Sequence, residues 1–452
     1  MSSPSNKGLK RFFTPNPTPD RLELLRQAAD FMKKSSEFKQ KARALMALAN
    51  KTPPKKRRFG ADLASAEVVS SSSSSDQKKR KFSSSDEESS QKVKKPRREG
   101  YRLPYNDASY ERAKYLATTS AEIHDMLQRY GVAVVPNVVS DPQTVWREMY
   151  TAIEYMYDGF AFHDKCTWPL LRRVSAMKHG MLLQHLGIGW SQFAVNLRQD
   201  PVVAGIFAGL WSEHMRAPIA VNDLFSSADG VSFYCNTPTE RGGWHSRDRE
   251  WMHLDQSAAS SGVWGVQGAL NLVETKKNDA CFSFLECSHL HFDEFMHRLS
   301  NQAKKDGVSF DEHKRFTMLE NQAQLNFYVN QKKCVPKCMA ALPGDLVLWS
   351  SKTVHSGIPA VRPEVPVDPS TVFLRGVVYV SYQPKALATA ADIKKKIKAF
   401  DELRNTTHDA AAGVTLFQKA PHTYGRSCDT VIRPVSQKPV LTPLGASLFA
   451  VV

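Results

Sequence analysis

The sequence has few cysteines and no long apolar run, and both shortages limit the kind of protein that it can encode. Its seven cysteines are scattered and form no Cys-x-x-Cys pair, so neither a disulfide framework nor a zinc ribbon is indicated. No apolar stretch approaches the length of a membrane span, and the N-terminus has no apolar signal segment. We therefore expect reduced cysteines in a soluble intracellular protein without a membrane partner.

Acidic residues are scarce at the N-terminal end, and the positive charge of the chain is concentrated there. Residues 1–100 contain 24 Lys and Arg against 11 Asp and Glu, so the net charge of +16 leaves only +3 for residues 101–452. Because phosphate contacts need clustered Lys and Arg, a broad nucleic-acid-binding surface is not expected on the folded body. The basic tail itself could contact nucleic acid.

Composition divides the chain into four segments. Residues 1–18 are polar and Pro-rich, and residues 19–50 place apolar side chains near helical spacing, which predicts one isolated amphipathic helix. Residues 51–100 are rich in Ser, Lys and Arg and should be disordered, because they hold too little apolar surface to offset the chain entropy. Residues 101–440 are expected to form the folded domain.

Within this domain, helices predominate first and strands follow. Helices are expected at Asp107–Arg129, at Asp141–Met156 and over most of residues 160–220, with Trp190, Phe193, Leu197 and Trp211 in the core. Strands are expected at Val132–Val135, Val231–Cys235, Val263–Leu272, Cys281–Leu285, Ala341–Trp349 and Val372–Tyr382, with a polar helical insertion at residues 291–329. This order predicts an α+β fold with a mainly β core, a sandwich or jelly roll flanked by helices.

The triplet His253-Leu254-Asp255 is the strongest candidate for a functional motif. Side chains alternate along an extended chain, so His253 and Asp255 would share one face. His355 is the best third ligand, because it follows a Gly-Asp turn and an apolar strand, where a short loop can project a side chain rigidly. Two imidazoles and a carboxylate can bind one face of a ferrous ion and leave the other face open. The alternative is a surface loop with a satisfied histidine, since His-x-Asp pairs often arise by chance.

Two arginines could hold an acidic co-substrate beside such a metal. Arg375 lies on an alternating strand, from which a guanidinium can bind a carboxylate through two hydrogen bonds, although an ordinary interstrand salt bridge is the alternative. Arg362 is nearer to His355 in sequence but lies in a Pro-rich loop, so Arg375 is preferred. Trp244, Trp251 and Trp264 could line the pocket, although large aromatic residues more often belong to the core.

The order of these motifs resembles the phytanoyl-CoA dioxygenase-like branch of the iron(II)/2-oxoglutarate oxygenases. The resemblance covers approximately residues 125–385 and rests on His253-x-Asp255, Gln267 to Glu274, Cys287-Ser288-His289, Pro343-Gly344-Asp345, His355 and Arg375. It implies a double-stranded β-helix, cupin-like, in which His253, Asp255 and His355 bind Fe(II). It also implies that Arg375 holds the distal carboxylate of 2-oxoglutarate.

The same resemblance implies a reaction. An oxygenase of this kind hydroxylates a C–H bond while 2-oxoglutarate is converted to succinate and CO2, and the presence of Asp255 favours hydroxylation over halogenation. Asn271 would touch the co-substrate, or else be buried and satisfied by the backbone. Two departures from the family pattern are Glu286-Cys287-Ser288-His289, in place of a Pro-Gly-Ser-His turn, and a longer segment between His355 and Arg375. The sequence does not identify the prime substrate.

Residues 6–13 resemble the PIP-box-like motif by which replication and repair proteins dock on the sliding clamp. Leu9, Phe12 and Phe13 would form an apolar plug for a pocket on the clamp, although the first position, normally Gln, is Asn6. The alternative is a terminal apolar cluster that packs on the protein's own body. A rival function for the whole chain is therefore a nuclear interaction protein that docks on the clamp and uses an oxygenase-like scaffold.

Three basic runs in the tail resemble nuclear import signals: Pro53–Arg58, Lys78–Lys81 and Lys94–Arg98. They predict import receptors as partners and a nuclear location, or a location shared between nucleus and cytoplasm. The alternative is nonspecific binding of polyanions.

Overall fold

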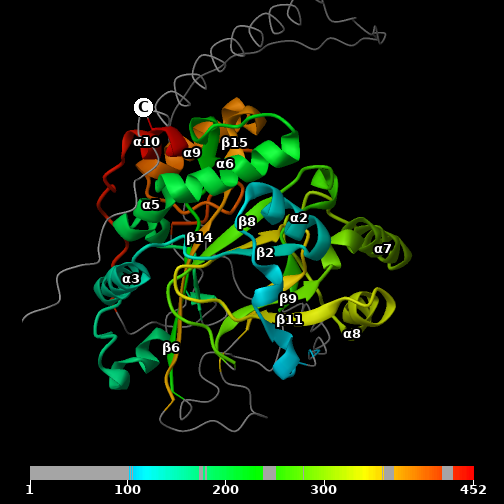
Figure 1. Ribbon diagram of the computed structural model, residues 1–452, viewed down its shortest axis with the longest axis horizontal. Coiled ribbons are helices and arrows are strands. Elements are labelled where there is room, and N and C mark those ends of the chain that lie inside the picture. The colour runs from blue at the N-terminus through cyan, green and yellow to red at the C-terminus, as the bar shows by residue number, and fades with distance from the viewer. Residues whose placement is uncertain are drawn as a thin grey trace, which may run out of the picture. The chain divides into compact units, whose positions relative to one another are not determined.

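The computed structural model describes residues 101–451 with gaps at 102, 104, 173–176, 179–180, 238–250, 278, 359, 361–370 and 420–430. The described residues all belong to one compact unit, Lys92–Val452 (Figure 1). The clamp-like motif, the isolated helix, the linker and the import signals predicted for residues 1–100 lie outside the described residues.

Two β-sheets form the centre of this unit, which confirms the expected α+β class with a mainly β core. The larger sheet has the order β2-β12-β8-β14-β6-β4-β3 and the smaller one the order β1-β11-β9-β13-β7-β10. The strands of the larger sheet are β2 (Val132–Val135), β12 (Leu346–Ser350), β8 (Val266–Asn271), β14 (Phe373–Val380), β6 (Val231–Asn236), β4 (Leu182–Leu183) and β3 (Met177–Lys178). Those of the smaller sheet are β1 (Tyr110–Glu111), β11 (Val335–Met339), β9 (Cys281–Glu286), β13 (His355–Ile358), β7 (His253–Leu254) and β10 (Thr317–Met318).

The chain passes repeatedly from one sheet to the other. From β6 to β9, each strand lies in the sheet that the previous strand does not occupy, and the same holds from β11 to β14. Between these two stretches, β9 and β11 pair antiparallel within the smaller sheet. Consecutive strands within these two stretches therefore lie in different sheets, while β7 and β13, far apart in sequence, pair side by side in the smaller sheet.

The central strand β12 shows why the strands read as continuous apolar runs. Val347 and Trp349 pack into the cluster between the two sheets, together with Phe282 of β9. The alternate residues Leu346 and Leu348 pack into the cluster formed with the helices. Because side chains alternate along a strand and both faces are covered here, all five residues of β12 are buried.

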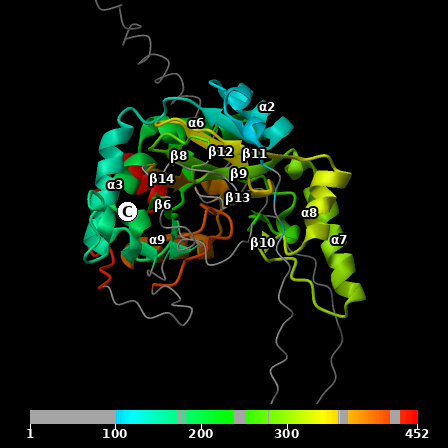
Figure 2. The same ribbon diagram turned by 90° about the horizontal axis from the view of Figure 1, so that it is seen from below.

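Helices pack against the larger sheet, and two further helices pack beside the smaller sheet. In Figure 1, α3 (Pro142–Met156) and α5 (Gln192–Arg198) lie at the left, and α7 (Phe292–Lys305) and α8 (Gln322–Asn326) lie at the right, with α6 (Pro201–Met215) and α2 (Ser120–Tyr130) between them. Figure 2 also shows α3 on the side opposite α7 and α8. The short α4 (Pro169–Arg172) and the small sheet of β5 (Leu224–Ser226) and β15 (Tyr382–Pro384) complete this part of the chain. The predicted helical insertion at residues 291–329 is therefore confirmed in outline.

Two expected helices near the start of the domain have different outcomes. The helix expected from Asp107 begins only at Ser120, because Thr119 and Glu122 form a capping box at that point. It ends at Gly131, whose φ of 78° is left-handed, as expected. The second helix starts at Pro142 after Asp141 accepts a hydrogen bond from the Thr144 amide, which confirms that prediction.

The single strand expected at Ala341–Trp349 is also corrected, because a turn occupies its first half. Gly344 has a φ of 91°, and a Cβ at this position would lie 2.9 Å from the Val139 carbonyl oxygen. Asp345 accepts hydrogen bonds from the Leu342 amide, at 2.7 Å, and from both Nε and Nη2 of Arg112, at 2.6 and 2.8 Å. The turn sets where β12 begins and thereby the position of His355 after it.

The folded part continues beyond residue 440, where the predicted domain ended. Helices α9 (Ala390–Asp401) and α10 (Pro443–Phe449) pack together, and the buried Phe449 contacts a cluster that includes Trp190 and Phe400. Among the described residues, no helix is both long and apolar enough to cross a membrane.

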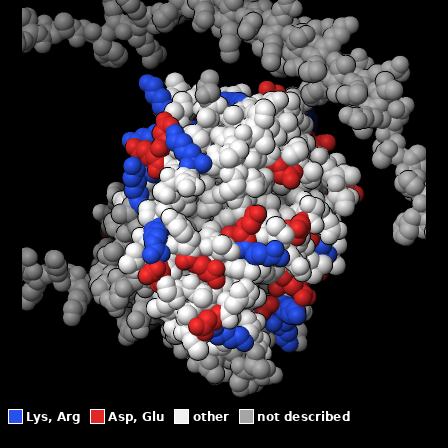
Figure 3. Space-filling view, turned by 90° about the vertical axis from the view of Figure 1, so that its left-hand side faces the viewer, with Lys and Arg blue, Asp and Glu red and all other residues white. Residues whose placement is uncertain are grey.

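Charges of both signs are mixed on the face shown in Figure 3. Lys and Arg side chains lie among Asp and Glu side chains there, next to wide uncharged areas. This mixture agrees with the small net charge of residues 101–452.

Candidate metal centre

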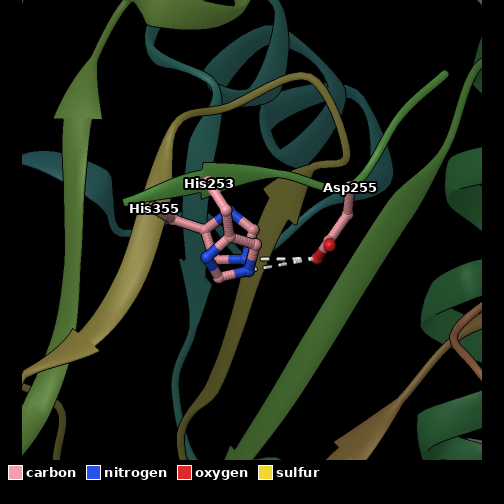
Figure 4. Close-up of side chains that lie close together, drawn as sticks. All are labelled: His253, Asp255 and His355. Carbon is pink, nitrogen blue, oxygen red and sulfur yellow. Dashed lines mark ion pairs between the residues drawn. The ribbon is translucent and has the colours of Figure 1, made fainter. Parts of the chain in front are cut away.

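Three predicted ligands meet inside the smaller sheet. His253 on β7 lies directly opposite His355 on β13 in the register of the two strands. Their Nε2 atoms are 3.6 Å and 3.4 Å from Asp255 Oδ2, respectively, and the three ligand atoms all lie within 4.8 Å of one another (Figure 4). His253 and Asp255 therefore lie close together, as the His-x-Asp pattern predicts, and the three residues could hold a metal ion.

The backbone sets the tautomer of both imidazoles. His253 Nδ1 is 3.1 Å from the Trp251 carbonyl oxygen, and His355 Nδ1 is 2.9 Å from the Thr353 carbonyl oxygen. Because a carbonyl oxygen can only accept, each Nδ1 must donate, which leaves the Nε2 lone pair free in a neutral ring. Both free lone pairs face the Asp255 carboxylate, as the ligands of a metal ion would.

The electrostatics of the group favour the protonation states that bind a metal. Burial alone would raise the pKa of Asp255, but the neighbouring His253 and His355 hold it well below the usual range. Burial lowers the pKa of His355, and His253 lowers it further, although Asp255 acts in the opposite direction. An ionised carboxylate beside a neutral imidazole is the state that a divalent cation requires of its ligands.

Neighbouring side chains fix the orientation of the ligands. The Trp251 ring stacks on the His253 ring with centroids 4.7 Å apart, and its indole N–H donates to the Gly357 carbonyl oxygen at 2.7 Å. Gln267 Nε2 donates to Asp255 Oδ2 at 3.0 Å. Trp251 thus lines the cavity as expected, whereas Gln267 lies in a family motif but is not predicted as a site residue from the sequence.

The three ligands line a cavity of about 520 Å³, and Arg375 lines the same cavity. Arg375 Nε donates to Ser232 Oγ at 2.9 Å and its Nη1 donates to the Ala280 carbonyl oxygen at 3.3 Å. Among the described residues Arg375 has no acidic partner, so the alternative of an interstrand salt bridge does not hold there. Its guanidinium can therefore bind a carboxylate inside the cavity.

Other predicted residues lie elsewhere. The Asn271 amide donates to the carbonyl oxygens of Val273 and Leu342, at 2.6 and 3.1 Å, and Asn271 is not among the residues that line the cavity. Its placement matches the alternative of a buried, backbone-satisfied side chain. Trp264 packs against Trp211 and His214 outside the cavity. Arg362 and Trp244 lie outside the described residues.

Several residues of the cavity wall were not predicted. Arg315 forms an ion pair with Asp409, and both line the cavity together with Phe316, His408 and Asp229. Burial lowers the pKa of His408, but Asp409, together with Asp255 and Asp229, raises it more. These residues come from the polar insertion, a loop before β6 and the segment after α9, and no motif marks them in the sequence.

Comparison with known proteins finds similarity at low sequence identity. No protein-family model matches the chain. Ava biosynthesis cluster protein O of Aspergillus versicolor is 25% identical over 288 residues, which are 63% of this chain and 84% of that protein.

Solved structures are also similar at low identity, and SnoN and GIG2 are among them. SnoN, a non-heme alpha ketoglutarate dependent epimerase of nogalamycin biosynthesis, is 13% identical with a TM-score of 0.36, over 59% of this chain and 83% of that one. GIG2 of Candida albicans is 12% identical with a TM-score of 0.41, over 62% of this chain and 66% of that one. Both TM-scores are below 0.5, and the chemistry of the site is therefore argued from the residues of this chain.

Proposed function

We propose that the protein is an iron(II)- and 2-oxoglutarate-dependent dioxygenase of the phytanoyl-CoA dioxygenase-like type, which hydroxylates a C–H bond. The observation that carries the proposal is the meeting of two imidazole nitrogens and one carboxylate oxygen within 4.8 Å of one another, on the wall of a cavity that also contains Arg375. Two His and one carboxylate with open positions are typical of non-heme iron oxygenases. The order of the strands in the two sheets supports a double-stranded β-helix as the scaffold.

Each residue of the site has a defined task in this reaction. His253, Asp255 and His355 would hold the metal, and the Arg375 guanidinium, oriented by Ser232, would bind the distal carboxylate of 2-oxoglutarate. Iron(II) held by these residues would supply O2 activation, and the hydroxylation would place one oxygen atom in the substrate and the other in succinate, with release of CO2. The aromatic rings of Trp251, Phe282 and Trp349 line the cavity and exclude bulk water from the reacting atoms.

Anaerobic titration with Fe(II) and 2-oxoglutarate tests this proposal. We expect the protein to bind both and to convert 2-oxoglutarate to succinate when O2 and a substrate are added. His253→Ala should abolish the conversion, since it removes one of three metal ligands. His297→Ala, which changes an exposed histidine on α7, is the matched control and should behave as the unchanged protein.

The nature of the oxidation is tested with isotopically labelled O2. Hydroxylation places one labelled atom in the product and one in succinate. If succinate carries the label but the oxidised substrate does not, the enzyme oxidises the substrate without transferring an oxygen atom to it. If the iron-loaded protein fails to bind 2-oxoglutarate, the dioxygenase proposal is wrong.

The place of action that we propose is the nucleus, supported by the three basic runs of the tail. Docking on the replication sliding clamp through Leu9, Phe12 and Phe13 is proposed on the motif alone. The complete set of metal ligands favours an enzyme over an interaction protein that merely keeps the scaffold.

A further inference from the structure

The edge strand β10 brings two residues of the insertion close to the metal ligands. It pairs antiparallel with β7, so that Met318 lies opposite His253 and Thr317 opposite Leu254. The two preceding residues, Arg315 and Phe316, therefore reach the cavity, and the Phe316 ring centroid is 4.8 Å from that of His253.

The Arg315 guanidinium is held from behind. Its Nη1 forms an ion pair with Asp409, whose side chain is only 7% exposed, whereas the Arg315 side chain is 35% exposed. Gly413, with a φ of 74°, lies so close that a Cβ there would overlap the guanidinium. Asp409 thus fixes the direction of the guanidinium and is the less exposed of the two groups, and the N–H groups that Asp409 does not use are left for a ligand.

The two carboxylates at this end of the cavity, Asp409 and Asp229, are both held by groups of the protein. His408 lines the wall next to Asp409, and its Nε2 lies 3.8 Å from Asp409 Oδ1. The other carboxylate nearby, Asp229, is buried and accepts hydrogen bonds from the Gly230 amide at 2.6 Å and from the Gln184 amide at 3.4 Å. Both carboxylates are therefore engaged by protein donors, whereas the Arg315 side chain is more exposed than its partner and can be reached by a ligand.

The remaining wall is mostly aromatic, and its size fits a small molecule. A cavity of about 520 Å³ falls within the range of small-molecule sites, roughly 300–1,000 Å³. The rings that line it are those of Trp251, Phe282, Phe316, Trp349, Tyr379 and Phe417. Such walls favour flat apolar rings, and a second guanidinium besides that of Arg375 favours one anionic group on those rings.

We propose that Arg315 binds a carboxylate of the prime substrate, and that this substrate is a small, largely apolar ring compound. The inference rests on the proposed function, in which Arg375 is occupied by 2-oxoglutarate and is not available for the substrate. Arg315 then acts as a specificity-determining residue, because its guanidinium fixes which C–H bond of the ring compound faces His253 and His355.

Three probes of the same ring system test this inference on the full-length protein. We would measure the binding of 2-naphthoate, 2-naphthamide and 2-naphthylmethylamine by ligand-observed NMR, with Zn(II) and saturating 2-oxoglutarate present under anaerobic conditions. The carboxylate should bind at least about tenfold more tightly than the amine, which corresponds to about 1.4 kcal/mol. Equal binding of the three probes would contradict the inference without any variant.

Variants then assign the preference to one side chain. Arg315→Gln should weaken naphthoate binding by about tenfold and remove the preference for it, and Arg315→Lys, which keeps the charge but not the paired donors, should fall between. Arg129→Gln is the matched control, because Arg129 is also paired with an aspartate, Asp125, but lies on α2 and does not line the cavity. Unchanged naphthoate binding in Arg315→Gln would show that another group binds the carboxylate.

Failure of the inference is separable from failure of the proposed function. If 2-oxoglutarate binds and is converted to succinate but the carboxylate probe has no advantage, only the assignment of Arg315 is wrong. If 2-oxoglutarate does not bind, the dioxygenase proposal fails, whatever the probes do. If the natural substrate is a nucleobase or a peptide, we expect the neutral amide probe to bind more tightly than the carboxylate probe. This result would also overturn the inference.

Discussion

Gln267 illustrates how one side chain beside the ligands can decide whether a metal site is well formed. Its amide donates to Asp255 Oδ2, the oxygen that both imidazole Nε2 atoms also face. Asp255 follows the last residue of β7 and is only partly buried, so its side chain has less packing to hold it than the two histidines have. The hydrogen bond from β8 therefore restricts the carboxylate to the side on which the metal would lie.

Gln267→Leu should weaken metal binding without unfolding the protein. The shape of the side chain is roughly kept while its donor is lost, so we expect about 10–100-fold lower affinity for Fe(II) or Co(II), in line with losses of outer hydrogen bonds at other metal sites. Competition with a chelating dye measures the effect. Gln302→Leu on α7, which removes an exposed amide paired with Asp306, is the control; a similar affinity for both variants would exclude the orienting role.

The ligands could be predicted from sequence, whereas the substrate end of the cavity could not. His253 and Asp255 are two residues apart, and local alternation of side chains is enough to place them together. His355 was predictable because a turn and an apolar strand precede it. Arg315 and Asp409 are brought together by the docking of the insertion against the segment after α9, and no local pattern encodes that contact.

At the level of elements, helix α9 buries the side chain of a lysine, Lys396, whose charged form is unfavourable away from water. Lys396 is buried against the small β5–β15 sheet, where its Nζ donates to the Ser226 carbonyl oxygen at 2.7 Å and lies 4.9 Å from the centre of the Phe225 ring. Burial, and to a smaller extent Lys385, lowers the pKa of Lys396 to about 7. The folded state therefore prefers the neutral amine, while the unfolded chain keeps the lysine protonated up to about pH 10.

This shift predicts a stability that rises with pH between about 7 and 10, because the unfolded state binds one more proton than the folded state in that window. Lys396→Met removes the cost of the buried amine, so it should raise the free energy of unfolding more at pH 7 than at pH 10, with a difference on the order of a few kcal/mol. Urea unfolding at both pH values measures it. Lys395→Met, on the exposed face of α9, should show no such difference.

Strands differ in how far their sequence predicts them. β2, β6 and β9 are buried along their whole length and read as apolar runs, so they were predicted nearly to their ends. β11 (Val335–Met339) contains Pro and Lys, and β7 has only two residues. Such short or polar segments become strands because neighbouring strands supply their hydrogen-bond partners, which is information that the segment itself does not contain.

At the scale of the whole molecule, the chain combines a nearly neutral body with a strongly basic N-terminal part. Residues 101–452 carry a net charge of +3 out of +16 and contain the complete set of proposed metal ligands. The proposed oxidation and the proposed nuclear location thus depend on separate parts of the chain. Changes in one part should leave the other unaffected.

This separation predicts the outcome of a localisation experiment. Replacing the Lys and Arg residues of Pro53–Arg58, Lys78–Lys81 and Lys94–Arg98 with Ala should shift a fluorescent fusion from the nucleus to the cytoplasm, while 2-oxoglutarate binding by the purified protein stays the same. The converse variant, His253→Ala, should lose the metal and stay in the nucleus. Nuclear accumulation of the Ala variant would show that the basic runs are not import signals.

The backbone hydrogen bonds of the two histidines have a consequence for how such a site can change over evolutionary time. Each ring is held by the carbonyl of the residue two positions before it, at Trp251 and Thr353, and every amino acid provides that carbonyl. The tautomer is therefore inherited from the path of the main chain and does not require a second side chain to be retained. Mutational drift in the surrounding wall can exchange one substrate for another while both imidazoles keep the same nitrogen free.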